Sequence, residues 1–273
     1  MKNGYYYIIS SLPELNLSDK NLEYDMLSFR EYVSELLEEV DFKMLKILYY
    51  PYDIPNFINL IKANGAAWDA RGNYTREAFD AMLMVPDTLP VFLQQFYDET
   101  RPDWEKTSEK ELINTATSLF IDWSRTVQNP FLKKWLYFDQ NLKNLLIWLN
   151  SNKFDMKPNE EVLGENYEAE YLRATNADDL NLHSWDLPFK EALTHFDNPN
   201  VALREYLIDQ MRWKYLDELE ENYAFGIERL MAFVIKLQII NRNIVTTEEA
   251  GRERLEQLLQ GIRKEYEMPE TFN

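Results

Sequence analysis

Apolar residues recur every three or four positions along most of this 273-residue chain, and this spacing constrains the fold more than any other feature. Such periodicity is typical of amphipathic helices, which bury one face against a core. The seven glycines of the chain agree with this, because β-hairpins and parallel sheets use more turns. The pattern predicts an all-α protein, a bundle of helical hairpins. Residues 5–11 are the one stretch with the character of a strand.

Helix-end signals divide the chain further. The expected helices cover residues 18–40, capped by Ser18 and Asp19; 41–50, starting at Asp41; a helix from Asp53, with Pro55 in its first turn; 108–128, with a Ser108–Glu111 capping box; a helix from Pro130; 200–222; 225–243; and 246–266, capped by Thr246. Residues 151–199 collect Asn, Asp, Pro and Ser and predict loops and short helices. Two interpretations stay open: a single helical domain over 1–273 with a long surface excursion, or lobes 1–150 and 200–273 joined by an irregular segment.

The charge of the chain excludes several classes of partner. With 29 Lys+Arg against 47 Asp+Glu, the net charge is −18, which predicts no nucleic-acid binding and no direct insertion into anionic lipid. Cysteine is absent, which excludes disulfides, thiolate metal sites and cysteine nucleophiles. No stretch reaches the roughly 18 apolar residues of a spanning helix, and residues 1–13 lack the pattern of a secretory leader. We therefore expect a cytoplasmic protein.

Catalytic signatures do not emerge from the sequence. The glycines are too dispersed for a phosphate-binding loop, and His183 and His195 are not spaced as zinc ligands on one helical turn. His195 beside Glu191 is the best candidate for a general base with an orienting carboxylate, but a helix-end histidine facing solvent is the favoured interpretation. We expect no catalytic, cofactor-binding or metal-binding residues. The 17 Tyr, 15 Phe and 7 Trp instead favour a binding or scaffold role, since aromatic side chains are enriched in interfaces.

Two segments of the chain resemble each other and suggest an internal repeat. Residues 52–61, YDIPNFINLI, and residues 138–146, FDQNLKNLL, both place an aromatic–Asp pair before Asn, an apolar residue and a second Asn. This alignment matches Asp53 with Asp139, and Asn56 with Asn141. It predicts two helical hairpins in which the Asp caps the second helix and the aromatic residue packs at the bend. A looser third segment, IINRNI at 239–244, lacks the aromatic–Asp pair and contains Asn243.

Further segments resemble known proteins. The opening YYYIISSLPEL at 5–15 is similar to the start of an uncharacterised bacterial family whose genes sit among those of V-type (V/A-type) ATPases in Bacteroidetes and related phyla. Residues 225–244, FGIERLMAFVIKLQIINRNI, resemble a run of the C subunit of these ATPases (the d subunit in eukaryotes), in which Gly-aliphatic-Glu opens an apolar helix that ends in an Arg-Asn-aliphatic turn. The segments at Tyr52 and Phe138 look like the equivalent turns of its earlier repeats. This chain is shorter than a typical C subunit, and residues 151–199 have no clear counterpart in it.

The resemblance to the C subunit implies a fold and a function. It implies a funnel of three pseudo-symmetric helical units that sits on the membrane rotor ring and receives the central stalk, coupling ATP turnover to ion translocation without catalysis. The partners would be the central-stalk subunits and the rotor ring, and the location would be peripheral to the inner membrane through protein contacts. We expect acidic residues in the socket to meet basic residues of the stalk. The alternative is a helical protein–protein interaction or regulatory protein unrelated to the ATPase, which gives no reason for three similar units.

Overall fold

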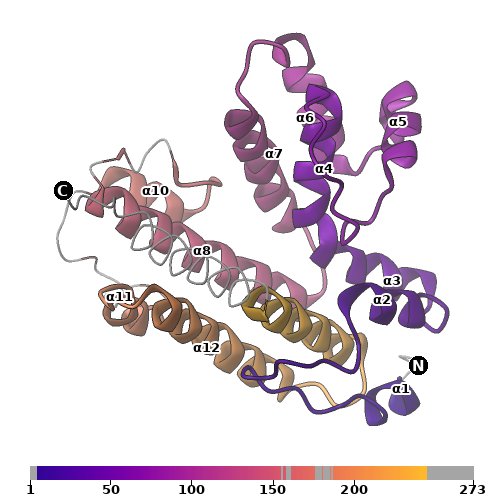
Figure 1. The fold of residues 1–273 in the computed structure, drawn as a ribbon, viewed down its shortest axis with the longest axis vertical. Helices are drawn as coiled ribbons and strands as arrows, with labels where there is room; N and C mark the ends of the chain where they lie inside the picture. The colour runs from indigo at the N-terminus through magenta and orange to yellow at the C-terminus, as the bar shows by residue number, and fades with distance from the viewer. Residues whose placement is uncertain are drawn as a thin grey trace, which may run out of the picture.

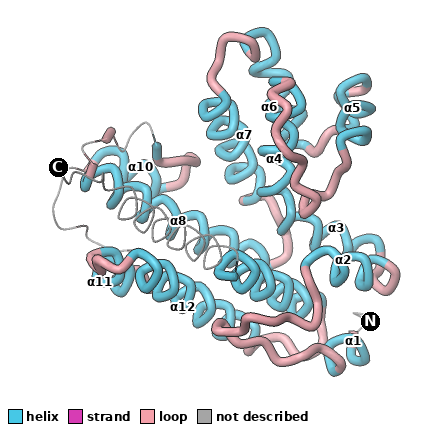
Figure 2. Tube along the Cα trace, viewed as in Figure 1, coloured by secondary structure: helices cyan, strands magenta, loops and turns pink. Residues whose placement is uncertain are grey.

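A computed structural model describes residues 5–154, 156–157, 161–175, 180, 185 and 187–244. Helices dominate and no strand occurs in these residues, so the predicted all-α class is confirmed (Figure 2). The strand predicted at 5–11 is wrong, because Tyr6–Ser10 form the short helix α1. Tertiary contacts hold this helix in place: the Tyr5 amide donates to the Phe225 carbonyl at 2.8 Å, and the Tyr6 ring packs on the Phe225 ring. The helix predicted at 246–266 lies outside the described residues.

The first group of helices comprises α2 (Met26–Ser34), α3 (Glu39–Lys46), the 3₁₀ turn η1 (Ile47–Tyr49) and α4 (Tyr50–Lys62). The predicted helix over 18–40 is wrong in extent, because Asp25 is the N-cap and accepts from the Leu27 and Ser28 amides. The segments α3, η1 and α4 follow one another without a loop. The helix predicted to start at Asp53 therefore starts at Tyr50, and Pro55 lies inside it rather than in its first turn.

The second group comprises α5 (Arg76–Met84), η2 (Pro86–Thr88), α6 (Val91–Thr100), η3 (Arg101–Asp103) and α7 (Glu109–Ser124). Together with α4 these elements form an arm that projects from the rest of the molecule (Figure 1). Aromatic rings join them, with the Phe57 ring of α4 lying 5.2 Å from the Phe79 ring of α5. The predicted capping box of Ser108 and Glu111 is present at the start of α7.

The third group comprises α8 (Pro130–Lys153), α10 (Tyr167–Ala174), α11 (Lys190–Phe196), α12 (Val201–Glu220) and a helix over residues 227–244, here called the last described helix. Asn129 and Asn200 cap α8 and α12 with their side chains. The helices α10 and α11 pack against α8, and α11 also packs against α12. One cluster of buried apolar side chains extends through all three groups, from Tyr5 to Ile239.

The long helix α8 corrects the hairpin predicted around Phe138 and Asp139. It runs through both residues without a bend, because no glycine or proline interrupts it after Pro130. Asp139 therefore lies in mid-helix and caps nothing. The arrangement of three units as a funnel stays a prediction. Among the described residues, no helix has the length and apolar character needed to cross a bilayer.

Candidate functional site

A cavity of about 700 Å³ lies where the helical groups meet. Its described walls come from η1, the start of α4 and the loop after it, the C-terminal end of α7, the middle of α8, Arg212 of α12 and the last described helix. Each of the three resembling segments contributes to it: Tyr52 from the first, Asp139 and Gln140 from the second, and Asn241 and Arg242 from the third. Segments far apart in the sequence thus converge on one hollow of the size that binding sites commonly have.

The first pair of predicted repeat residues, Asp53 and Asn56, holds the loop that leads from α4 to α5. The buried Asn56 side chain donates to the Asp69 carbonyl at 2.8 Å and accepts from the Asp69 amide at 2.9 Å. The Asp53 carboxylate accepts from the Asn73 amide at 2.7 Å and from Asn73 Nδ2 at 2.6 Å. Asp53 therefore binds a loop twenty residues away and does not cap a helix, which corrects the predicted role.

Asp53 is fully buried, and its surroundings perturb its titration. Burial raises the pKa of Asp53 to about 7, although hydrogen bonds from Asn73 and Tyr74 favour the charged form. The loop packs directly on the carboxylate, since a Cβ added at Gly72 would lie 2.6 Å from Asp53 Oδ1. Glycine is thus required by close approach at this position.

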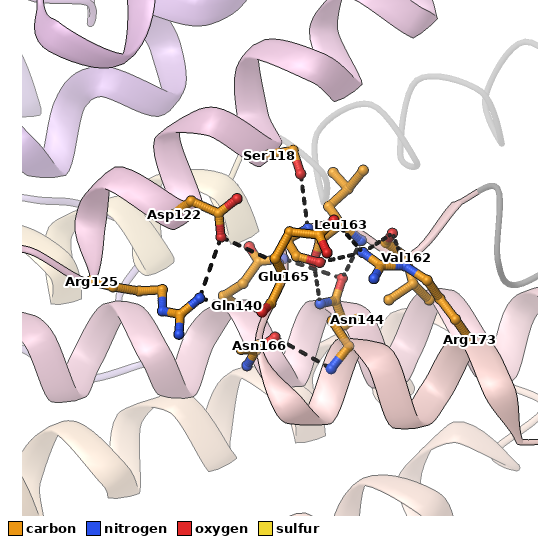
Figure 3. A network of polar contacts seen from close by, with 12 residues as sticks. Ser118, Asp122, Arg125, Gln140, Asn144, Val162, Leu163, Glu165, Asn166 and Arg173 are labelled. Carbon is orange, nitrogen blue, oxygen red and sulfur yellow. Dashed lines mark hydrogen bonds and ion pairs between the residues drawn. The ribbon is translucent and has the colours of Figure 1, made fainter. Parts of the chain in front are cut away.

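A second cluster repeats this arrangement on α8 (Figure 3). The buried Asn144 side chain donates to the Leu163 carbonyl at 2.8 Å and accepts from the Leu163 amide at 3.1 Å. Three residues earlier, Asn141 Oδ1 accepts from Asn166 Nδ2 at 2.8 Å, and Asn166 is the N-cap of α10. The loop held here leads directly into the next helix, as the loop held by Asn56 leads to α5.

The contacts define which residues correspond between the two segments. Asn56 corresponds to Asn144, because each side chain hydrogen-bonds both the amide and the carbonyl of a single loop residue. Asp53 corresponds to Asn141, because each lies three positions earlier and accepts from an asparagine side chain of the same loop. The sequence alignment, which matched Asp53 with Asp139 and Asn56 with Asn141, was shifted by two to three residues. For the third segment, Asn243 lies in the final described turn of its helix. Two of the three segments thus share a contact pattern that the sequence shows only faintly.

Asp139, on the cavity wall, belongs to an ion-pair network. Its carboxylate contacts Arg212 Nε at 2.8 Å and Lys143 Nζ at 2.7 Å. Burial by itself raises the pKa of Asp139, but the charges of Lys143 and Arg212 outweigh it and hold the pKa well below its usual range. Asp139 is therefore a charged anchor for α12.

The network continues to the last described helix through Asp209. Arg212 Nη1 contacts Asp209 Oδ1 at 2.9 Å, and the same oxygen also accepts from Arg242. Asp209 and Arg212 are both buried, so these charges compensate one another away from water. Neither residue was singled out from the sequence, because this Asp–Arg pair three positions apart lies on a helix with six further charged residues and does not stand out among them.

The charge of the cavity lining differs from the expectation of an acidic socket. Among the described lining residues, four are cationic, Arg71, Lys143, Arg212 and Arg242, and Asp139 is the one carboxylate. The Arg71 guanidinium stacks over the Tyr52 ring at 4.4 Å from its centroid. The lining of this cavity is therefore mainly cationic, and the acidic socket expected from the sequence stays a prediction.

His195 and Glu191, the candidate base and its orienting carboxylate, are not joined by a polar contact in the described structure. Glu191 and His195 both line a separate hollow of about 480 Å³ against α12. In the described part of the chain, no hydrogen bond or ion pair joins the His195 ring to a carboxylate. His183 lies outside the described residues.

A family model matches residues 1–266, and its description is "Protein of unknown function (DUF2764)". The chain belongs to this family. No curated protein matches it, and no solved structure matches it. A function for this DUF2764 member therefore depends on the geometry of its own residues, above all on the cavity where the three segments converge.

Proposed function

We propose that this chain is a non-catalytic adaptor of a V-type ATPase, similar to the C subunit of that enzyme, that links the central rotor stalk to the membrane rotor ring. In this role it couples ATP turnover in the soluble head to ion translocation in the membrane. The proposal assigns the chain no catalytic step and no cofactor. It places the chain in the cytoplasm, peripheral to the inner membrane, where it is held by protein contacts.

The observation that carries the proposal is the convergence on one cavity of the three segments that resemble the C subunit. Tyr52, Gln140 and Arg242, one from each segment, all line it. A socket for a stalk must be formed between its helical units, and a cavity at their meeting point meets that requirement. The matched clamps of Asn56 and Asn144 support a common origin for the first two units.

An adaptor that transmits torque must also resist deformation around its socket. The chain of ion pairs from Lys143 through Asp139, Arg212 and Asp209 to Arg242 crosses α8, α12 and the last described helix. Only Asp209 and Arg212 of these residues are buried, and hydrogen bonds to such charged groups contribute about 1.5–3 kcal/mol. The network therefore opposes separation of the helices on this side of the cavity.

The test is capture of the tagged full-length chain from native membranes in mild detergent, with mass spectrometric identification of what co-purifies. The proposal predicts recovery of the central-stalk and rotor-ring subunits of the V-type ATPase. A preparation that retains the tagged chain but lacks every ATPase subunit would contradict it and favour an interaction protein unrelated to the ATPase.

A further inference from the structure

A second cavity, of about 590 Å³, adjoins the first between α7 and α8. The two share a wall made of Ile121 and Ser124 from α7, and of Leu136 and Gln140 from α8. Because they share these four residues, the two cavities lie next to each other. We call the two adjoining cavities together the basic groove.

Cationic side chains dominate the groove. The second cavity adds Arg125, Lys133 and Lys134 to the four cations of the first, and its described lining contains no carboxylate. Seven cationic side chains therefore face one carboxylate, Asp139, in a chain whose net charge is −18. A hollow of one sign on a protein of the opposite sign focuses the field on a complementary partner.

The surplus charge is concentrated at the end formed by the second cavity. In the first cavity, Arg71, Lys143 and Arg212 each form an ion pair with an aspartate at 2.9 Å or less. At the other end, Lys133 and Lys134 are exposed, and no ion pair joins either to a carboxylate of the described residues. Arg125 is half-exposed, and its Nη1 makes a loose pair with Asp122 at 3.7 Å and a long hydrogen bond to the Glu165 carbonyl at 3.3 Å. These three cations remain available to a ligand.

The rest of the lining indicates what kind of anion fits. Ile121 and Leu136 supply apolar surface at the middle of the groove, and Tyr137, Asn141 and Asn166 supply polar groups near the three cations. A buried carboxylate nearby, Glu168, accepts from Asn166 Nδ2 and does not line the groove. An elongated surface with an apolar centre and a cationic end matches a polypeptide segment with apolar and acidic residues better than a compact inorganic anion.

We propose that the basic groove docks an acidic segment of a partner protein, with carboxylates of that segment against Arg125, Lys133 and Lys134. The inference rests on the proposed adaptor function, for which it names the chemistry of the segment that enters: the stalk presents acidic residues to this chain. It reverses the charge relation expected from the sequence.

Binding of a fluorescent poly-L-glutamate peptide to the purified full chain, followed by anisotropy, tests this directly. The variant Lys133→Glu/Lys134→Glu reverses two groove charges. The control Lys20→Glu/Lys106→Glu makes the same change in net charge at exposed lysines outside the groove. We expect the groove variant to weaken binding about tenfold or more, the control to stay within about twofold, and binding to the wild type to fall with added salt.

Three results would overturn the inference: no binding to the wild type, equal losses in the two variants, or binding of inorganic tripolyphosphate without binding of the peptide. The last of these would assign the groove to a small anion. Capture from membranes with the same variants separates this inference from the adaptor function. If the groove variant recovers ATPase subunits as well as the wild type does, the docking inference fails and the adaptor function stands. If the wild type binds the peptide but recovers no ATPase subunit, the adaptor function fails.

Discussion

Replacement of Asn144 by alanine tests whether the paired asparagine clamps hold the fold around the cavity. The Asn144 side chain is fully buried, and it satisfies both backbone groups of Leu163 and accepts from Gln140 Nε2 at 3.2 Å. Truncation to alanine removes these side-chain hydrogen bonds, while α8 itself keeps its backbone hydrogen bonds. The stability change of the variant therefore measures the contribution of the Asn144–Leu163 clamp rather than that of the helix.

The magnitude follows from the two backbone groups left without a partner. Each unsatisfied buried group costs about 1–3 kcal/mol, and because Leu163 is only half-buried we take the lower end, or about 2 kcal/mol for both. The higher helix propensity of alanine stabilises α8 by about 0.5 kcal/mol and offsets part of this loss. We therefore expect the free energy of unfolding to fall by about 1.5 kcal/mol.

The assay is urea unfolding followed by far-UV circular dichroism, with the slope against denaturant compared between variants. Asn150→Ala is the matched control on the same helix, because the one hydrogen bond that the Asn150 side chain donates to a described residue goes to the Leu146 carbonyl one turn before it, at 2.9 Å. We expect this control to change stability by less than about 0.5 kcal/mol. Equal losses in Asn144→Ala and Asn150→Ala would show that the clamp on Leu163 does not stabilise the fold.

Three further predictions concern buried groups. The pKa of Asp53 in the folded protein, about 7, lies above its ordinary value of 3.8, so its contribution to stability is complete below pH 3.8 and is lost as the pH rises through 7. The free energy of unfolding of the wild type should therefore decline relative to that of Asp53→Asn over this pH range. A constant difference between the two unfolding free energies would contradict this prediction. Gly72→Ala should lower stability by about 1–3 kcal/mol in thermal and chemical melts, since its Cβ would lie 2.6 Å from Asp53 Oδ1, and a neutral effect would show that the loop can move. Arg212→Met should cost about 1.5–3 kcal/mol, because it removes the charged hydrogen bonds to Asp139 and Asp209 and leaves each carboxylate with one half-exposed cation, Lys143 or Arg242; a loss under about 1 kcal/mol would contradict the anchoring role of the network.

Helices with strong local end signals were predictable from the sequence. The capping box at Ser108, the asparagine before Pro130 and the one before residue 201 each combine a side-chain cap with an apolar stripe, and the structure has helices at those places. Local chemistry alone sufficed there, because the cap and the helix that it starts are adjacent in the chain.

Elements fixed by distant contacts were not predictable in the same way. The run at residues 5–11 has the composition of a strand, but it forms a helix whose first residues pack against Phe225. Ser18 and Asp19 resemble a cap as well as Asp25 does, and only the packing of Phe29 and Val33 into the core distinguishes them. Sequence periodicity carries no information on which of several possible caps is used.

The candidate site was only partly predictable. The three resembling segments all contribute residues to one cavity, a convergence that their spacing in the sequence does not reveal. The role of each residue did not follow, because Asp53 and Asp139 look alike in sequence, whereas one holds a loop and the other pairs with Arg212. The excess of cations in the groove was hidden by a net charge of −18, which averages over the whole surface.

The most direct test of the central claim is site-specific cross-linking from the cavity to the stalk. Because the chain has no cysteine, Gln140→Cys places a single thiol on the wall shared by both cavities, and Lys106→Cys places one on an exposed site away from them. Each is labelled with a photoreactive maleimide and incorporated into native membranes. If the chain is the proposed adaptor, position 140 cross-links to a central-stalk subunit of the V-type ATPase and position 106 does not. Stalk cross-links that are absent at position 140, or equally strong at position 106, would contradict this proposal.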